Sequence, residues 1–337
     1  MQMLTGKRIV LTGGTGFVGG HLLPKLVQAE ADVHCIVRSS SDTSRLPPEV
    51  KTHVCDLASG AGLKEALDHC DVFIHMAALL FGSGFQAYLE NNGTSAQRLC
   101  QALAEIAHPP KRVILLSSMA ASGPDASEQG ASDGCLPRPV SAYGWSKLFV
   151  ERTFQAHFQG ELIILRPGII YGSGDRGLLP VFQGAKHGFA VSPGFGRSFP
   201  VSCIHAQDMA DALICALQAQ AHGIYHVSDG QRYSMDSFCQ AICQALGRKA
   251  HIFHIPLPIM AVTAACATFW ARLRACLSRD KSAKAPNWNL DKYREAREAG
   301  WVCDSSRLSR DTDFHARLSL AQGMEESVEG YRKRGWL

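Results

Sequence analysis

The chain has 337 residues, of which 46% are hydrophobic and 19% are charged, and its formal net charge is +4. This length allows one large domain or two of ordinary size, and the apolar fraction is sufficient for a packed core, which excludes a disordered chain. The small positive charge is scattered and lacks the dense block of Lys and Arg that nucleic-acid binding needs. No nucleic-acid partner is therefore expected.

Twelve cysteines are dispersed along the chain without a CxxC pair. Cys239 and Cys243 lie one helical turn apart, and no neighbouring pair of His or Cys would complete a metal site with them. We predict that both are buried thiols and that the protein holds no metal. No signal-like pattern precedes the first predicted strand, so we expect a cytoplasmic, reducing environment.

A glycine-rich turn separates the first predicted strand, residues 9–11, from a segment with helical periodicity over 21–27. Gly13 can adopt the positive φ of a tight turn, Gly16 lets a pyrophosphate approach the backbone, and Gly19 lets the helix pack close to the strand. The N-terminus of that helix offers free N–H groups and the positive end of its dipole to an anion. This order predicts a dinucleotide-binding βα unit.

Further apolar runs alternate with helical patterns, and the alternation predicts a parallel, doubly wound sheet. The next predicted strands cover residues 32–38, 50–57, 71–78, 111–118 and 162–167, and a long helix to about residue 107 follows the fourth strand. Beyond residue 170 the alternation loosens. We predict a nucleotide-binding domain over residues 1–170, with a return contribution from about 200–228, and a smaller substrate-binding domain over 171–337.

The second predicted strand ends at Arg38, and three serines follow it. Many NAD-binding sheets place an acidic residue there to hold the ribose hydroxyls, whereas an arginine followed by hydroxyls suits a 2′-phosphate. NADP is therefore predicted as the cofactor in preference to NAD. Two alternatives stay open: that the cofactor is NAD, and that Arg38 is only a solvated loop residue. Asp56, beside Leu57 at the end of the third strand, can accept the adenine amino group. Ala77 and Ala78 end the fourth strand with small side chains where the cofactor would cross the sheet.

Tyr143 and Lys147 are four residues apart, so both side chains lie on one face of a predicted helix. A tyrosine with an ordinary pKa of about 10 is a poor acid–base catalyst at neutral pH, and a neighbouring ammonium is expected to lower that pKa. Ser118, at the carboxyl end of the fifth strand, can hydrogen-bond the oxygen of a substrate carbonyl. The three side chains are predicted to meet at the carboxyl edge of the sheet, where open α/β folds bind ligands.

Over nearly its whole length the chain resembles the extended short-chain dehydrogenases/reductases. The matching segments are Thr12-Gly13-Gly14-Thr15-Gly16-Phe17-Val18-Gly19, Asp56-Leu57, His75-Met76-Ala77-Ala78, Ser117-Ser118, Tyr143-x-x-x-Lys147, Arg166-Pro167-Gly168-x-x-Tyr171-Gly172 and Ile204-His205-x-x-Asp208-Met209-Ala210. The resemblance implies a Rossmann-type fold with a catalytic triad of Ser118, Tyr143 and Lys147. It also implies cofactor contacts from Gly13, Thr15, Gly16, Phe17, Val18, Ala77, Ala78, Tyr143, Lys147, Pro167 and Gly168, with Lys147 on the nicotinamide ribose. Asn92 is a further catalytic candidate, although Ser95 replaces a glycine that is usual in the family.

Sugar-nucleotide epimerases and dehydratases of this family typically carry an arginine four residues before the motif histidine, His205. That position is Val201 here, and Arg197 lies further back. The C-terminal part, residues 301–331, looks like the branch of hydroxysteroid dehydrogenases and dihydroflavonol reductases, which act on bulky apolar alcohols and ketones. His205 and Asp208 are interpreted as structural.

The predicted function is therefore NAD(P)-dependent interconversion of an alcohol and a ketone on a bulky apolar substrate. A sugar-nucleotide epimerase or dehydratase with tightly bound NAD is the alternative. A cofactor-binding subunit without turnover is a lesser alternative, and the intact triad speaks against it.

Residues 255–271 are uncharged, and basic side chains follow at Arg272, Arg274, Arg279, Lys281 and Lys284. The run is shorter than the about 20 apolar residues of a spanning helix and begins with prolines. Two interpretations stay open: a helix of the substrate domain that covers the pocket, or an interfacial helix that lays Met260, Phe269 and Trp270 on an anionic membrane. A homodimer also stays open.

Overall fold

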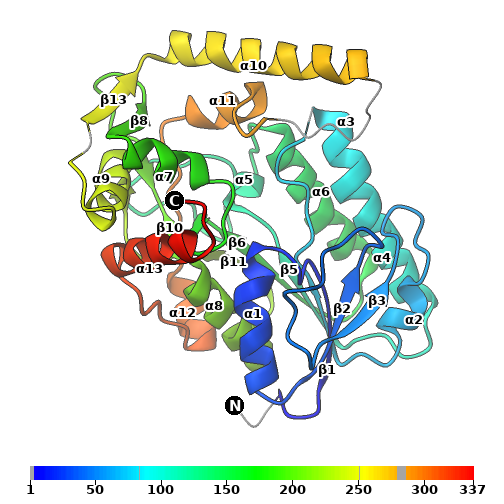
Figure 1. The fold of residues 1–337 in the computed structure, drawn as a ribbon. Helices are drawn as coiled ribbons and strands as arrows, with labels where there is room; N and C mark the ends of the chain where they lie inside the picture. The colour runs from blue at the N-terminus through cyan, green and yellow to red at the C-terminus, as the bar shows by residue number, and fades with distance from the viewer. Residues whose placement is uncertain (1–3, 83, 250, 279–285) are drawn as a thin grey trace.

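The computed structural model describes residues 4–82, 84–249, 251–278 and 286–337, and the side chains of 275–278 fall outside this description. Seven parallel strands form the main sheet in the order β11-β6-β5-β4-β1-β2-β3 (Figure 1). They are β1 (Arg8–Thr12), β2 (Asp32–Val37), β3 (Lys51–Val54), β4 (Val72–His75), β5 (Arg112–Leu116), β6 (Glu161–Pro167) and β11 (Gly223–Val227). The strand order reverses between β1 and β4, and ligands of such folds bind at the carboxyl ends of the strands beside this point. The predicted doubly wound, Rossmann-type sheet is confirmed.

Helices cover both faces of this sheet (Figure 1). One face carries α1 (Phe17–Gln28), α8 (Ala206–Gln218) and α12 (Ser306–Thr312), and the other carries α2 (Leu63–Leu67), α4 (Thr94–Glu105) and α6 (Ala142–His157). Each helix turns its apolar side to the sheet; Leu22 and Leu26 of α1, for example, are fully buried. These two apolar layers hold the strand ends, and with them the site, in fixed positions.

The chain after β4 does not form the single helix that the sequence predicts. It begins as α3 (Phe85–Tyr88), passes through a π-helical segment (Leu89–Gly93) and continues as α4. After β5 comes the short helix α5 (Met119–Ser122). A π-helical turn in this position places one extra residue in the helix, and such turns are frequent at functional sites.

The remaining elements form a smaller part above the carboxyl ends of the sheet (Figure 1). Its strands pair in twos: β7 (Ile169–Tyr171) with β10 (Cys203–His205), β9 (Pro200–Val201) with β12 (Tyr233–Ser234), and β8 (Phe189–Pro193) with β13 (His251–Ile255). Its helices are α7 (Leu179–Lys186), α9 (Met235–Ala245), α10 (Leu257–Ser278), α11 (Leu290–Ala296) and α13 (Leu320–Lys333). Cys239 and Cys243 are buried on α9, as predicted. The domain boundaries at 170 and 200–228 stay predictions.

Helix α10 lies along the top of the molecule with α11 directly below it (Figure 1). A helix over this apolar segment was expected, but Met260 points into the protein and is only 7% exposed. The interfacial interpretation, which would lay Met260 on the membrane, is therefore wrong for this residue. Of the basic side chains noted after this segment, Arg279, Lys281 and Lys284 lie outside the described residues. Among the described helices, none is both long enough and apolar enough to span a membrane.

Candidate active site

The glycine turn between β1 and α1 forms an open cradle. Gly13 has a φ of +80°, and a Cβ on it would stand 2.8 Å from the backbone nitrogen of Ala77. A Cβ on Gly19 would overlap the backbone of Gly14, so the helix could not approach the strand as closely. Gly16 begins α1 without a side-chain cap, and no acidic residue lies in the first turn. The first N–H groups of the helix are therefore free for an anion, which fits a dinucleotide pyrophosphate.

The other residues predicted for this turn lie at its rim. Thr15 is exposed, and Phe17 and Val18 are half-buried in the first turn of α1. Their backbone N–H groups belong to the set that an α-helix leaves without a partner at its N-terminus. This placement agrees with the predicted contacts to the phosphates, which stay predictions for the individual residues.

The residues predicted for the adenosine half follow β2 and β3. Arg38 is exposed, its backbone N–H donates to Ser41 Oγ at 3.0 Å, and its guanidinium forms no ion pair within the described residues. It is thus available to a 2′-phosphate. The Asp56 carboxylate accepts a hydrogen bond from the Ser59 hydroxyl at 2.7 Å, which is the main cause of its lowered pKa. This carboxylate is bonded within the loop that follows β3. Its contact with adenine therefore stays a prediction, and so does the cofactor contact of the half-buried Leu57.

At the end of β4 the small side chains stand beside the glycine turn. The Thr12 hydroxyl accepts hydrogen bonds from the N–H groups of Met76 and Ala77, both at 3.2 Å, and bonds His75 Nδ1 at 2.8 Å. These contacts join the ends of β1 and β4. Ala77 and Ala78 are half-buried and present only methyl groups at this edge, which leaves room for the cofactor to cross.

Asn92 lies in the π-helical segment and is buried. Its Oδ1 accepts the N–H of Leu79 at 2.7 Å, and its Nδ2 donates to the carbonyl of Leu79 at 3.2 Å and to Ser146 Oγ at 3.1 Å. The amide thereby ties the chain after Ala78 to α6. These are the contacts of a positioning residue, and the catalytic role of Asn92 stays a prediction.

Ser118, Tyr143 and Lys147 meet at the carboxyl end of β5, as the sequence predicts. Ser118 begins α5, Tyr143 lies in the first turn of α6, and their side chains hydrogen-bond each other. Lys147 is 3% exposed, and its Nζ donates to the carbonyl of Leu116 at 2.6 Å. The phenol and the ammonium therefore stand on one helix face, above the strand that carries Ser118.

Burial controls the acid–base behaviour of this pair. It raises the pKa of the Tyr143 phenol well above its ordinary value; the Glu295 carboxylate adds to the rise, and the hydrogen bond with Ser118 opposes it. Burial lowers the pKa of Lys147 to about 8, against the opposing charge of Glu151. The expectation that Lys147 brings the pKa of Tyr143 toward neutrality is wrong for the protein without cofactor, because desolvation of the phenolate is the larger effect.

A buried ion pair below the site was missed by sequence reasoning. Arg166, at the end of β6, pairs with Glu151 of α6 at 2.6 Å, and both side chains are 1% exposed. Glu151 also accepts the hydroxyl hydrogen of Ser117. A buried charge needs such a partner, so the pair locks α6 to the sheet one turn after Lys147. The spacing of Tyr143, Lys147 and Glu151 at every fourth residue was the available signal.

The segment after β6 turns sharply beside the site. Pro167 ends the strand, and the N–H of Gly168 donates to the carbonyl of Val227 at 3.0 Å. A Cβ on Gly168 would overlap the carbonyl of Ser202, so glycine is needed for this close approach. Both residues lie at the carboxyl edge of the sheet, where the family pattern places cofactor contacts.

His205 and Asp208 have structural partners, as predicted. His205 is buried and pairs through Nε2 with Glu326 at 2.9 Å. The Asp208 carboxylate accepts the N–H groups of Arg317 and Leu318, both at 3.1 Å. These contacts join α8 to the C-terminal helix region.

Helix α11 contacts the N-terminus of α6, the helix that carries Tyr143 and Lys147. The buried Asp291 carboxylate accepts the N–H groups of Ala142 at 2.6 Å and Tyr143 at 3.1 Å, and so caps the N-terminus of α6. Lys292 Nζ lies 4.9 Å from the centroid of the Tyr143 ring and pairs with Glu295 at 2.8 Å. Sequence reasoning missed these three residues, because nothing local links them to a helix about 150 positions earlier.

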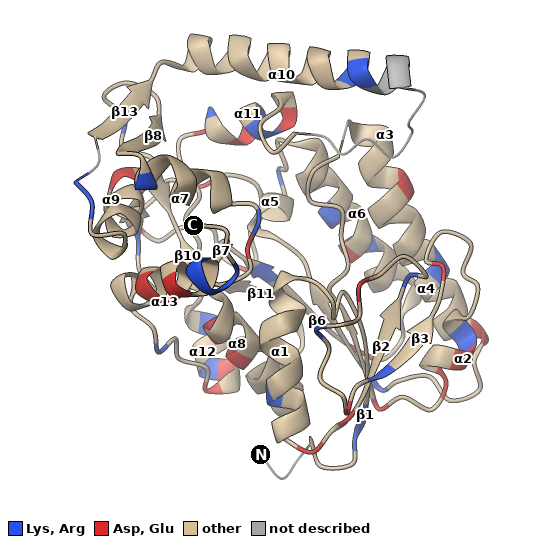
Figure 2. Ribbon diagram, viewed as in Figure 1, with Lys and Arg blue, Asp and Glu red and all other residues tan. Residues whose placement is uncertain are grey.

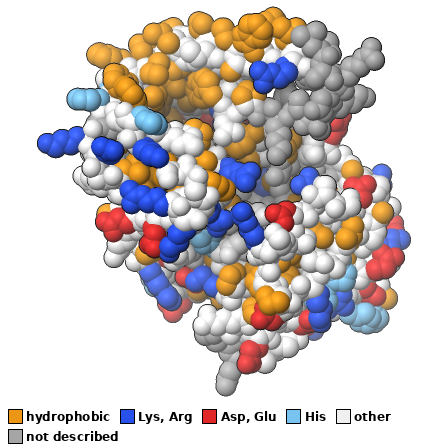
Figure 3. Space-filling model, viewed as in Figure 1, with side chains coloured by type: hydrophobic (Ala, Val, Ile, Leu, Met, Phe, Trp, Pro, Cys, Tyr) orange, Lys and Arg blue, Asp and Glu red, His pale blue; other side chains and the backbone are white. Residues whose placement is uncertain are grey.

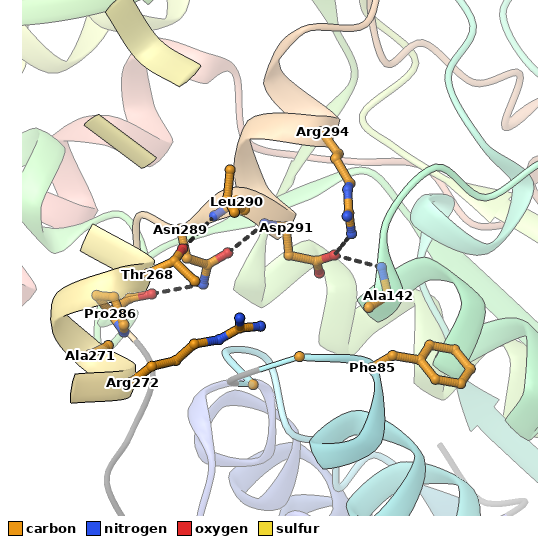
Figure 4. Close-up of a pocket in the computed structure, with 12 residues that line it drawn as sticks. Phe85, Ala142, Thr268, Ala271, Arg272, Pro286, Asn289, Leu290, Asp291 and Arg294 are labelled. Atoms are coloured by element: carbon orange, nitrogen blue, oxygen red, sulfur yellow. Dashed lines mark hydrogen bonds and ion pairs between the residues drawn. The ribbon is translucent and has the colours of Figure 1, made fainter. Parts of the chain in front are cut away.

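A pocket opens between α10, α11 and the loop before α3 (Figure 4). Its volume is about 530 Å³ with the open solvent at its mouth included, and its lining includes Ala142, Phe85, Thr268 and the charged Arg272 and Arg294. Arg272 extends into it from α10 (Figure 4). Ala142, the residue before Tyr143 in the chain, is the residue of α6 that lines this pocket.

One group of side chains outside the site has ligand types that could hold a metal. Asp68, His69 and His108 bring their ligand atoms within 4.8 Å of one another at the surface. The Asp68 carboxylate already accepts the backbone N–H groups of both histidines, at 3.1 and 3.0 Å. Loop closure therefore accounts for the cluster.

A dinucleotide cradle beside a buried Tyr–Lys pair is the arrangement of a nicotinamide-dependent oxidoreductase. Residues 9–228 match the NAD dependent epimerase/dehydratase family, and the chain belongs to this family. It is thus an NAD(P)-dependent enzyme of the extended short-chain dehydrogenase/reductase type. The residues of the cradle fit that cofactor.

Two relatives align along nearly the full chain. One is the ceramide reductase of Caulobacter vibrioides, 26% identical over 98% of this chain and 96% of its own. The other is the 4-hydroxy-2-methyl-3-oxo-4-farnesyl-3,4-dihydroquinoline-1-oxide ketoreductase of Stigmatella aurantiaca, 25% identical over 94% and 95%. The UDP-glucuronic acid 4-epimerase of Bacillus cereus, solved with NAD, superposes with a TM-score of 0.73 at 19% identity, over 97% of this chain and 96% of that one. At that identity the likeness shows the fold alone.

Proposed function

We propose that this enzyme reduces a ketone to an alcohol on a bulky apolar substrate, and can run the reverse oxidation. The observation that best supports this proposal concerns the position at which sugar-nucleotide enzymes of the family carry a diphosphate-binding arginine. Here Val201 is fully buried in β9. Arg197 cannot take over without breaking its hydrogen bonds to the carbonyls of Arg297 at 3.1 Å and Glu298 at 2.6 Å. The alternative function, a sugar-nucleotide epimerase, would use such an arginine to bind the diphosphate, and neither Val201 nor Arg197 supplies it here.

The printed names of the two full-length relatives also support the proposal. One is named a ceramide reductase and the other a ketoreductase of a farnesyl-bearing dihydroquinoline oxide.

The residues of the triad supply the proton chemistry. When bound, NAD(P)H supplies a hydride to the carbonyl carbon. The carbonyl oxygen gains negative charge as the C–H bond forms, and Tyr143 donates its phenolic proton to it. Ser118, which already bonds the phenol, can donate to the same oxygen and orient it. The buried Lys147 ammonium then stabilises the phenolate that is left behind.

The raised pKa of Tyr143 affects the pH range over which each direction can run. The protonated phenol that reduction needs is present throughout the neutral range, and the Lys147 ammonium offsets the cost of forming the buried phenolate when the proton is given up. Alcohol oxidation needs the phenolate before the reaction begins, which burial disfavours. We therefore infer that ketone reduction is the direction with the broader activity around neutral pH.

Tyr143→Phe tests the proposal because it keeps the ring and removes the proton. With a panel of long-chain and polycyclic ketones, NAD(P)H oxidation should fall by about 10²–10⁴-fold in the variant, while titration shows unchanged cofactor binding. Tyr225→Phe is the matched control, since that hydroxyl donates to Asp311 of α12, a helix packed on one face of the sheet. A variant that keeps half of the wild-type rate, or turnover of UDP-sugars with no reduction of any ketone, would overturn the assignment.

A further inference from the structure

Helix α10 has one side packed on the protein and the other in solvent. Met260 and Ala264 point inward and are buried, and the Thr268 hydroxyl accepts the N–H of Leu290 at 3.0 Å. Since successive residues turn by about 100°, the stripe opposite these positions faces away from the molecule. That stripe carries Ile259 (54% exposed), Val262 (62%), Phe269 (61%) and Trp270 (64%). A helix that only covered a pocket would not need four large apolar side chains on its outer side.

The ribbon of β8 and β13 continues this exposed apolar surface. Phe189, Val191 and Phe253 are exposed on one side, while Ala190 and Ser192 between them are buried. The rings of Phe189 and Phe253 lie 5.9 Å apart, centroid to centroid. Strand β13 ends one residue before α10 begins, so the two surfaces adjoin. Figure 3 shows hydrophobic side chains gathered along α10 and over this ribbon.

We call this surface the apolar face: Phe189, Val191, Phe253, Ile259, Val262, Phe269 and Trp270. The segments that supply it, 176–207 and 237–279, contain eight Lys or Arg residues and no Asp or Glu, although the whole chain has 34 basic and 30 acidic residues. Figure 2 shows no acidic residue on α10, β8 or β13. These segments therefore carry an excess of positive charge, although Asp236, just before the second segment, pairs with His254 of β13 at 3.3 Å.

The described basic side chains border the apolar face. Lys186 precedes β8, and Arg248 and Lys249 precede β13; all three are exposed. Arg274 falls on one flank of the outward stripe of α10, whereas Arg272 extends into the pocket below the helix (Figure 4). Within the described part of the chain, the four side chains that border the face (Lys186, Arg248, Lys249 and Arg274) form no ion pair. An apolar centre bordered by unpaired cations is the pattern of a surface that sits at the boundary between lipid head groups and acyl chains.

We propose that the apolar face docks on an anionic phospholipid bilayer, with α10 lying in the plane of the surface. A second copy of the chain fits this face less well, because a twofold interface would set the cations of one copy against those of the other. An anionic bilayer neutralises them instead. Docking needs no substrate, whereas delivery of a lipophilic substrate from the bilayer into the pocket below α10 rests on the proposed function.

Sedimentation of the full chain with vesicles tests the docking directly. Vesicles of phosphatidylcholine with phosphatidylglycerol should carry the protein down, vesicles of phosphatidylcholine alone should do so far less, and high salt should release it because screening shortens the reach of the charges. Lys186→Gln with Lys249→Gln should weaken binding by about 25-fold, or about fivefold per charge. Phe269→Ser with Trp270→Ser should weaken it by about tenfold or more.

Matched controls come from the main sheet, where Lys111 lies just before β5 and Val54 ends the edge strand β3. Lys111→Gln and Val54→Ser remove an exposed cation and an exposed apolar side chain outside the apolar face, and both should bind like the wild type. The Phe269/Trp270 double variant should keep its rate on a water-soluble ketone, which separates docking from catalysis. Equal binding to neutral and anionic vesicles, or no binding to either, would overturn the proposal. A dimer in sedimentation velocity that this double variant splits would assign the face to a second copy.

Discussion

Lys147→Met removes a buried cation. We expect the free energy of unfolding of this variant to increase, relative to that of the wild type, as the pH falls. Burial lowers the pKa of Lys147 from 10.5 to about 8, so the folded protein holds this proton less tightly than the unfolded chain does. Between the two pKa values the unfolded chain binds more protons, so the free energy of unfolding of the wild type rises with pH in that window. The free-energy cost of burying the charged Lys147 ammonium is present in full below the pKa of the folded protein. It disappears as the pH rises through the pKa of the unfolded chain. Its full size is about 3 kcal/mol, of which roughly 2 kcal/mol should be recovered between about pH 6.5 and about pH 9.5.

The pH slope is the diagnostic quantity, because methionine also leaves the carbonyl of Leu116 without its donor. That loss costs about 1–3 kcal/mol at every pH and shifts the variant by a constant. Urea unfolding followed by tryptophan fluorescence, for both proteins across the range, gives the difference in free energy of unfolding. Lys111→Met, which removes an exposed lysine, is the control. The explanation by a buried charge would be refuted if the difference in free energy of unfolding between variant and wild type stayed constant with pH, or if it favoured the variant more at high pH.

Two further predictions concern the cofactor and the tyrosine. The wild type should bind NADPH more tightly than NADH, and Arg38→Ala should remove about ten- to a hundredfold of that preference, since a charge-assisted contact is worth about 1.5–3 kcal/mol. Fluorescence titration measures this, and equal affinities in the wild type would exclude the 2′-phosphate contact. Glu295→Gln should lower the pKa of Tyr143, because that carboxylate helps to raise it. The midpoint of the pH profile of kcat/KM for alcohol oxidation should then move to lower pH, with Glu298→Gln as control; an unmoved midpoint contradicts the electrostatic account.

The features that the sequence predicted well depend on neighbours in the chain. The cradle at Gly13 and Gly16 needs only a strand, a turn and a helix in order, and each leaves a local pattern. The pairing of Tyr143 with Lys147 follows from the helical repeat. Ser118 was found because strand ends of a parallel sheet gather at one edge. The family resemblance rests on the same local motifs and is confirmed over residues 9–228.

Other parts of the site are made by residues distant in sequence. Asp291 caps the catalytic helix from 148 residues away, and Glu151 meets Arg166 only because α6 packs on β6. Neither contact leaves a periodicity in the chain. The π-helical turn at Asn92 also depends on tertiary packing, since its side chain bridges Leu79 and Ser146.

Composition and spacing thus determined the fold and the cofactor class, and predicted that Ser118, Tyr143 and Lys147 lie together, because these features depend on local backbone geometry and helical repeats. The tertiary structure decided which charges are buried and which apolar side chains remain in solvent. The pKa of Tyr143 shows the difference: the sequence indicates a lowering by Lys147, while burial in the folded protein raises it. Met260 shows it again, since an apolar residue of α10 can face either side and only packing against the molecule turned it inward while Phe269 and Trp270 stayed outside.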